Sequence, residues 1–134
     1  MRKHLFAISA LTIGFFTMGS ALAKPMIQFP MYDMEAAFKK HPNIEKLAFA
    51  HVPAPTQKLV GNWIHLGVSA PVDDEGNTYY AFACKPHDCG ANQINVIWTK
   101  DETQAWTRIV VNGKATLYNN PSSHIATALT GQGQ

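Results

Sequence analysis

Apolar residues in the first half of the chain recur at helical spacing. Met34, Ala37 and Phe38 share one face of a helix, with acidic residues at its start and lysines at its end, the charge order that a helix dipole favours. The step from His41 to Pro42 predicts that this helix stops there, because the residue before a proline avoids the helical region.

A second short helix is expected after Asn43, with Ile44, Leu47 and Ala48 facing the core. Two prolines then predict irregular structure over residues 51–56.

From residue 58 onward the apolar positions alternate, which is typical of strands. In one of them Tyr79, Ala81 and Ala83 are expected to face one side of a sheet, and Tyr80 and Phe82 the other. Residues 71–76 are read as an exposed turn, and residues 112–113 (Asn-Gly) as a tight hairpin turn. The expected strands cover residues 63–68, 78–84, 93–100, 105–111 and 115–118.

A last short helix is expected from Ser122 or Ser123 to Gly131. The fold class is therefore α+β, an antiparallel β-sheet of about five strands with short helices packed on one face. Trp63, Trp98 and Trp106 each fall inside an expected strand and are predicted to pack in the core or on the sheet.

The N-terminus predicts export. Arg2 and Lys3 precede an apolar run of about fourteen residues, too short for a membrane span, and Ala21-Leu22-Ala23 offers a cleavage site. We expect residues 1–23 to be a signal peptide and 24–134 to form a single domain, with no membrane contact after cleavage.

Charge excludes two classes of partner. Loss of Arg2 and Lys3 leaves nine of the eleven basic residues, against nine acidic residues. A net charge near zero gives no reason to expect nucleic acid or an anionic membrane as partner.

Both cysteines lie in one short stretch, Cys84-Lys85-Pro86-His87-Asp88-Cys89, between two expected strands. In an exported protein they are expected to form a disulfide across a hairpin. Closing so small a ring contributes roughly 2 kcal/mol, which makes stability alone a weak reason for it. Holding His87 ready for a partner is the stronger reason, because a stiff loop loses little freedom on binding.

Other interpretations of this ring stay open. It could be a plain structural clip in a periplasmic binding or folding-assistance module. A redox pair or a metal site fits less well, since redox pairs have C-x-x-C spacing and metal binding requires reduced thiols. We expect no metal and no cofactor, and no recognised catalytic motif indicates an enzyme.

Residues 78–99, with Tyr80-Ala81-Phe82-Ala83 leading into the Cys84–Cys89 ring, resemble the inhibitor of vertebrate lysozyme (Ivy) family of Gram-negative periplasmic proteins; the tail Ala128-Leu129-Thr130-Gly131 is more loosely similar. The resemblance implies a periplasmic location, protection of the cell wall and a c-type lysozyme as protein partner. It further implies that the ring enters the lysozyme active-site cleft, with His87 as the plug, Cys84 and Cys89 as the clamp, and Lys85, Pro86 and Asp88 beside them.

The resemblance has limits. Residues 24–60 show no correspondence, so a homodimer is left open and no dimer contacts are carried over. Since c-type lysozymes are strongly cationic, we also ask whether Asp73, Asp74, Glu75 and Asp88 form one acidic patch in space.

Overall fold

The computed structural model describes residues 33–69 and 72–131. The expected signal peptide and the start of the following segment lie outside the described residues. Within them, no helix is long and apolar enough to cross a membrane.

Three helices come first in the described chain, α1 (Met34–Lys40), α2 (Pro42–Ala48) and α3 (Ala54–Leu66). The Asp33 side chain caps α1 by accepting a hydrogen bond of 2.9 Å from the Ala36 amide. Pro42 opens α2, where proline needs no amide hydrogen. The first two helices were predicted from their apolar spacing, and both are confirmed.

Helix α3 corrects two predictions. Residues 54–56 were expected to be irregular and 63–68 to be a strand, yet α3 begins at Ala54 and ends only at Leu66. Proline is tolerated in the first turn of a helix, so Pro55 does not prevent it. Trp63 and His65, expected in a strand, are therefore helical, and only Val68 and Ser69 form the strand β1 (Val68–Ser69).

The remaining strands were placed correctly, with one addition. They are β2 (Asp73–Glu75), β3 (Thr78–Cys84), β4 (Gln93–Thr99), β5 (Ala105–Val111) and β6 (Lys114–Tyr118), and α4 (Ser123–Gly131) closes the described chain. The added strand is β2, which takes up three of the six residues of the expected turn at 71–76. Residues 76–77 make that turn instead, with Gly76 at a φ of 78°.

The sheet is antiparallel, with strand order β1-β3-β4-β5-β6. Strands β1 and β2 both pair with β3, β1 at its Cys84 end and β2 at its Thr78 end, so the two share one edge of the sheet. The expected α+β class and the antiparallel sheet are confirmed.

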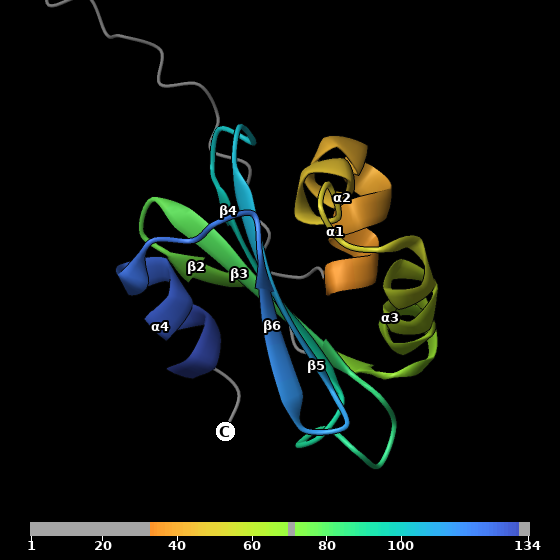
Figure 1. The fold of residues 1–134 in the computed structure, drawn as a ribbon. Coiled ribbons are helices and arrows are strands. Elements are labelled where there is room, and N and C mark those ends of the chain that lie inside the picture. Colours follow the sequence, from red (N-terminus) through yellow and green to blue (C-terminus); the bar gives the residue numbers. More distant parts are fainter. Residues whose placement is uncertain (1–32, 70–71, 132–134) are drawn as a thin grey trace, which may run out of the picture.

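Helices cover both faces of this sheet (Figure 1). Helices α1, α2 and α3 pack on the face that presents Tyr79, Ala81 and Ala83, and this side holds the larger core. Helix α4 packs on the other face, where Leu129 meets Tyr80 and Ile97. The expectation of helices on one face thus holds for the first three helices only.

The tryptophans pack as predicted. Trp63 and Trp98 are buried in the larger core, and Trp106 is half-buried against the smaller one.

Candidate functional site

The disulfide loop connects β3 to β4 at one end of the sheet. Cys84 is the last residue of β3, and Cys89 lies in the turn that follows. The two form a disulfide with their Cα atoms 4.9 Å apart, which confirms the predicted bond. The Asp88 amide donates a hydrogen bond of 3.1 Å to the Lys85 carbonyl, so residues 85–88 form a tight turn inside the ring.

The disulfide does not join the two strands as a hairpin clip would. In the strand register Cys84 pairs with Gln93, not with Cys89. The covalent bond therefore closes the first part of the loop on itself, and Cys89 stays outside the ladder. The disulfide therefore restricts the conformation of the ring and does not set the pairing of β3 with β4.

Exposure within the ring is uneven. Lys85, Pro86 and His87 are exposed, Asp88 is half-buried and Cys84 is fully buried. His87 has a φ of 63°, in the left-handed region, which few residues other than glycine adopt. A backbone in this region persists where the surrounding structure fixes it. The ring thus presents His87 to solvent from a constrained position.

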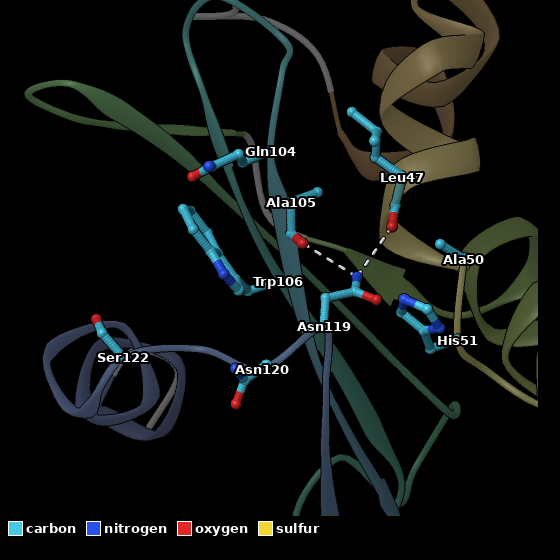
Figure 2. Close-up of a pocket in the computed structure, with 9 residues that line it drawn as sticks. All are labelled: Leu47, Ala50, His51, Gln104, Ala105, Trp106, Asn119, Asn120 and Ser122. Carbon is cyan, nitrogen blue, oxygen red and sulfur yellow. Dashed lines mark hydrogen bonds between the residues drawn. The ribbon is translucent and has the colours of Figure 1, made fainter.

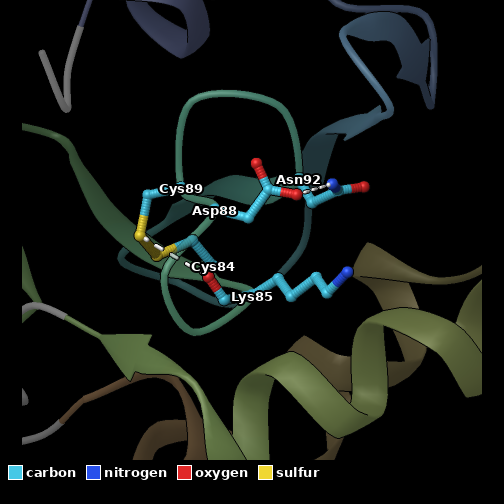
Figure 3. The surroundings of a disulfide bond; sticks show 5 residues. All are labelled: Cys84, Lys85, Asp88, Cys89 and Asn92. Atoms are coloured by element: carbon cyan, nitrogen blue, oxygen red, sulfur yellow. Dashed lines mark hydrogen bonds between the residues drawn. A yellow bond between two sulfur atoms is a disulfide. The ribbon is translucent and has the colours of Figure 1, made fainter.

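A buried asparagine, Asn92, forms hydrogen bonds to the disulfide loop (Figure 3). Its side-chain Nδ2 donates a hydrogen bond of 2.7 Å to the Asp88 carboxylate. Its backbone carbonyl accepts from the Lys85 amide at 3.0 Å, and its amide donates to the Asp88 carbonyl at 3.0 Å. Lys85, in contrast, extends its side chain away from these contacts.

The same residue connects the loop to the β5–β6 turn. The Asn92 Oδ1 accepts a hydrogen bond of 3.0 Å from the Asn112 amide, and the Gly113 amide donates to the Ala91 carbonyl at 2.9 Å. Asn112 and Gly113 both have positive φ, 50° and 81°, as the predicted tight hairpin turn requires. A second hairpin therefore supports the loop.

Helix α3 supports the base of the loop on the other side. The backbone at Gly67, just after the helix, lies so close to β3 that a Cβ added there would be 1.9 Å from the Cys84 carbonyl oxygen. Only glycine fits this approach. Asn92 and Gly67 were both missed from the sequence, because the contacts of Asn92 with Asn112 and of Gly67 with Cys84 join residues that are far apart along the chain.

The acidic residues do not form the single patch considered above. Asp73, Asp74 and Glu75 are exposed together on β2, which pairs with the far end of β3. A seven-residue strand is roughly 20 Å long, so this group is well separated from Asp88. Asp74 also forms an ion pair with Lys100 at 2.8 Å, and the hydrogen bond from that lysine lowers the Asp74 pKa.

A hollow of about 750 Å³ lies at the end of the sheet away from the loop (Figure 2). At its centre, Asn119 Nδ2 donates hydrogen bonds to the Leu47 and Ala105 carbonyls at 2.9 and 3.0 Å. These bonds fasten α2 to β5 and β6. The residues that line the hollow are Leu47, Ala50, His51, Gln104, Ala105, Trp106, Asn119, Asn120 and Ser122.

The described residues contain neither a free thiol nor a group of side chains arranged to bind a metal ion. Both cysteines of the chain are in the disulfide. No cluster of three or more His, Cys, Asp or Glu side chains within residues 33–69 and 72–131 could hold a metal ion.

Comparison with known proteins gives one match. The family model described as inhibitor of vertebrate lysozyme (Ivy) matches residues 54–131, more than half of the chain, from the start of α3 to the end of α4. No curated protein matches. No solved structure matches either.

Proposed function

Because the chain belongs to the inhibitor of vertebrate lysozyme family, we propose that it blocks c-type lysozyme by inserting its Cys84–Cys89 loop into the active-site cleft. In this proposal His87 is the plug, Cys84 and Cys89 are the clamp, and Lys85, Pro86 and Asp88 form its sides. The observation that carries it is the exposed His87, held at a positive φ within a disulfide-closed turn.

The chemistry of the target suits an imidazole. A glycosidase of this kind uses one protonated carboxylic acid and one ionised carboxylate on either side of the scissile bond. The imidazole ring has nitrogens on two edges, so one inserted histidine can hydrogen-bond to both carboxyl groups. The inserted ring also excludes the sugar from the cleft.

The loop is suited to insertion because its shape is set before binding. The disulfide, the turn at 85–88 and the contacts of Asn92 each restrict it, so little conformational entropy is lost when it meets a partner. Export fits the same proposal. The signal peptide at 1–23, a mature domain over 24–134 and a periplasmic location would bring the protein to the cell wall that lysozyme attacks.

Inhibition assays test this function directly. We expect purified mature protein to inhibit hydrolysis of cell-wall substrate by a c-type lysozyme, with a g-type lysozyme as comparison. His87→Ala should raise the inhibition constant roughly 30-fold or more, the effect of losing a binding hot spot. His124→Ala is the matched control, since His124 is exposed on α4.

A second variant tests the clamp. The double substitution Cys84→Ser with Cys89→Ser should weaken inhibition while circular dichroism shows that the sheet persists, because the disulfide does not join β3 to β4. Absence of inhibition by the parent protein, or full inhibition by His87→Ala, would refute loop insertion. The rival function, a periplasmic binding or folding-assistance module with a structural disulfide, expects no effect of His87 on any lysozyme.

A further inference from the structure

Leu66 is an exposed apolar side chain at the end of α3. It is 77 % exposed, against 39 % for Leu59 and 44 % for Leu117, the other large exposed hydrophobic residues in the described chain. The buried face of α3 is made by Val60, Trp63 and Ile64, so Leu66 adds nothing to the core. A single exposed leucine is ordinary on a protein surface, and its position decides whether it has a role.

Leu66 lies beside the base of the disulfide loop. The next residue, Gly67, packs against the Cys84 carbonyl, and the residue after that, Val68, pairs with Cys84 in the sheet. The end of α3, the loop and the β5–β6 turn share one end of the molecule (Figure 1). Lys85 directly follows Cys84 and Leu66 is separated from Val68 only by Gly67, so both residues lie next to the contact between β1 and β3 along the chain.

The ring alone is too small for a stable protein interface. Specific complexes bury about 800 Å² on each partner. Even at roughly 200 Å² for each side chain, the size of large aromatic residues, the exposed Lys85, Pro86 and His87 do not reach that area. The partner must also cover surface next to the loop.

We propose that Leu66 is part of the lysozyme-binding surface, where the apolar rim of the active-site cleft covers it when the loop is inserted. This inference rests on the proposed function. Clefts that bind ligands are lined mainly by apolar and aromatic side chains, so the partner offers a matching surface at its rim. An exposed leucine that becomes buried next to a rigid polar plug strengthens binding and excludes water from the hydrogen bonds of His87.

Paired leucine variants test the inference. We expect Leu66→Ala to raise the inhibition constant for c-type lysozyme roughly tenfold, and Leu66→Asp to raise it further. Leu117→Ala and Leu117→Asp are the controls, since Leu117 is exposed on β6; they should change the constant less than about twofold. Equal effects of the Leu66 and Leu117 variants would overturn the inference.

A spectroscopic measurement separates direct contact from an indirect effect on the loop. With leucine methyl groups labelled in the unmodified protein, addition of lysozyme should shift the Leu66 signals and leave those of Leu117 unchanged. Unshifted Leu66 signals in a complex that inhibits would overturn this inference and leave loop insertion standing. A parent protein that does not inhibit lysozyme would overturn both.

Discussion

At the scale of single residues, Asn92 places four polar groups in contacts that fix the loop. Its backbone amide and carbonyl bond within the loop, its Nδ2 bonds to Asp88, and its Oδ1 accepts from the Asn112 amide. The residue is 3 % exposed, so each of these groups would be left without water if its partner were lost. Asn92 therefore fixes the shape of the loop that carries His87.

Replacing this side chain tests the role. Asn92→Ala removes two side-chain hydrogen bonds, one from the Asn112 amide and one to the Asp88 carboxylate, which should lower the free energy of unfolding by about 1–3 kcal/mol in urea titrations. Because the loop also loses the hydrogen bond that Asn92 Nδ2 donates to the Asp88 carboxylate, the inhibition constant should rise at a temperature where the variant is fully folded. Asn62→Ala, at an exposed position of α3, should leave the inhibition constant unchanged and should not lower the free energy of unfolding. A variant that loses stability and still inhibits fully would show that the loop does not depend on Asn92.

The sequence predicted the disulfide ring but not the role of Asn92. Two cysteines allow a single pairing, and the residues between them carry the family resemblance. The role of Asn92 arises from a contact with Asn112, 20 positions further along the chain, which no local pattern reports.

At the scale of elements, α3 shows how a local pattern can mislead. Ile64, Leu66 and Val68 alternate as in a strand, while Val60, Trp63 and Ile64 have helical spacing. The structure follows the helical set, whose members are buried, and leaves Leu66 exposed. Burial against the sheet decides between the two patterns, and burial is not visible in so short a stretch.

Two glycines near the end of α3 should respond to alanine in opposite ways. At Gly67 a Cβ would collide with the backbone oxygens of Cys84 and Trp63, at 1.9 and 2.3 Å, so Gly67→Ala should destabilise the protein by about 1–3 kcal/mol. At Gly61, inside the helix, nothing lies within 4 Å, and Gly61→Ala should stabilise by about 0.5–1 kcal/mol. Urea unfolding of both variants measures the two changes in unfolding free energy. Similar effects at the two positions would contradict the close approach of α3 to the loop base.

At the scale of the whole molecule, the sheet separates two packed regions with different roles. The larger core joins α1, α2 and α3 to the sheet, while the smaller one joins α4 to the opposite face. The sequence predicted most strands, because turn residues and alternation are local signals. It could not assign α4 to a face, since alternate residues of β3 and β4 are apolar on both sides.

The smaller core should contribute to stability and not to inhibition. Leu129→Ala removes a fully buried side chain of α4 and should cost about 2–5 kcal/mol of unfolding free energy. The inhibition constant should stay unchanged where the variant is folded, because α4 packs on the face opposite α3 (Figure 1). Thermal unfolding and the lysozyme assay measure the two effects, with Leu117→Ala as the control for an exposed leucine. An inhibition loss as large as that of His87→Ala would place α4 in the binding surface.

The hydrogen bond from Gly113 to Ala91 has a consequence for the chemical ageing of the protein. In a flexible Asn-Gly sequence the glycine nitrogen loses its proton and attacks the carbonyl of the preceding side-chain amide, which releases ammonia and closes a succinimide ring. Water then opens this ring to aspartate or isoaspartate. Here that proton is donated to the Ala91 carbonyl, within a turn of fixed backbone shape. The contact that supports the loop therefore also protects Asn112 from deamidation, and a change that detaches the loop removes this protection.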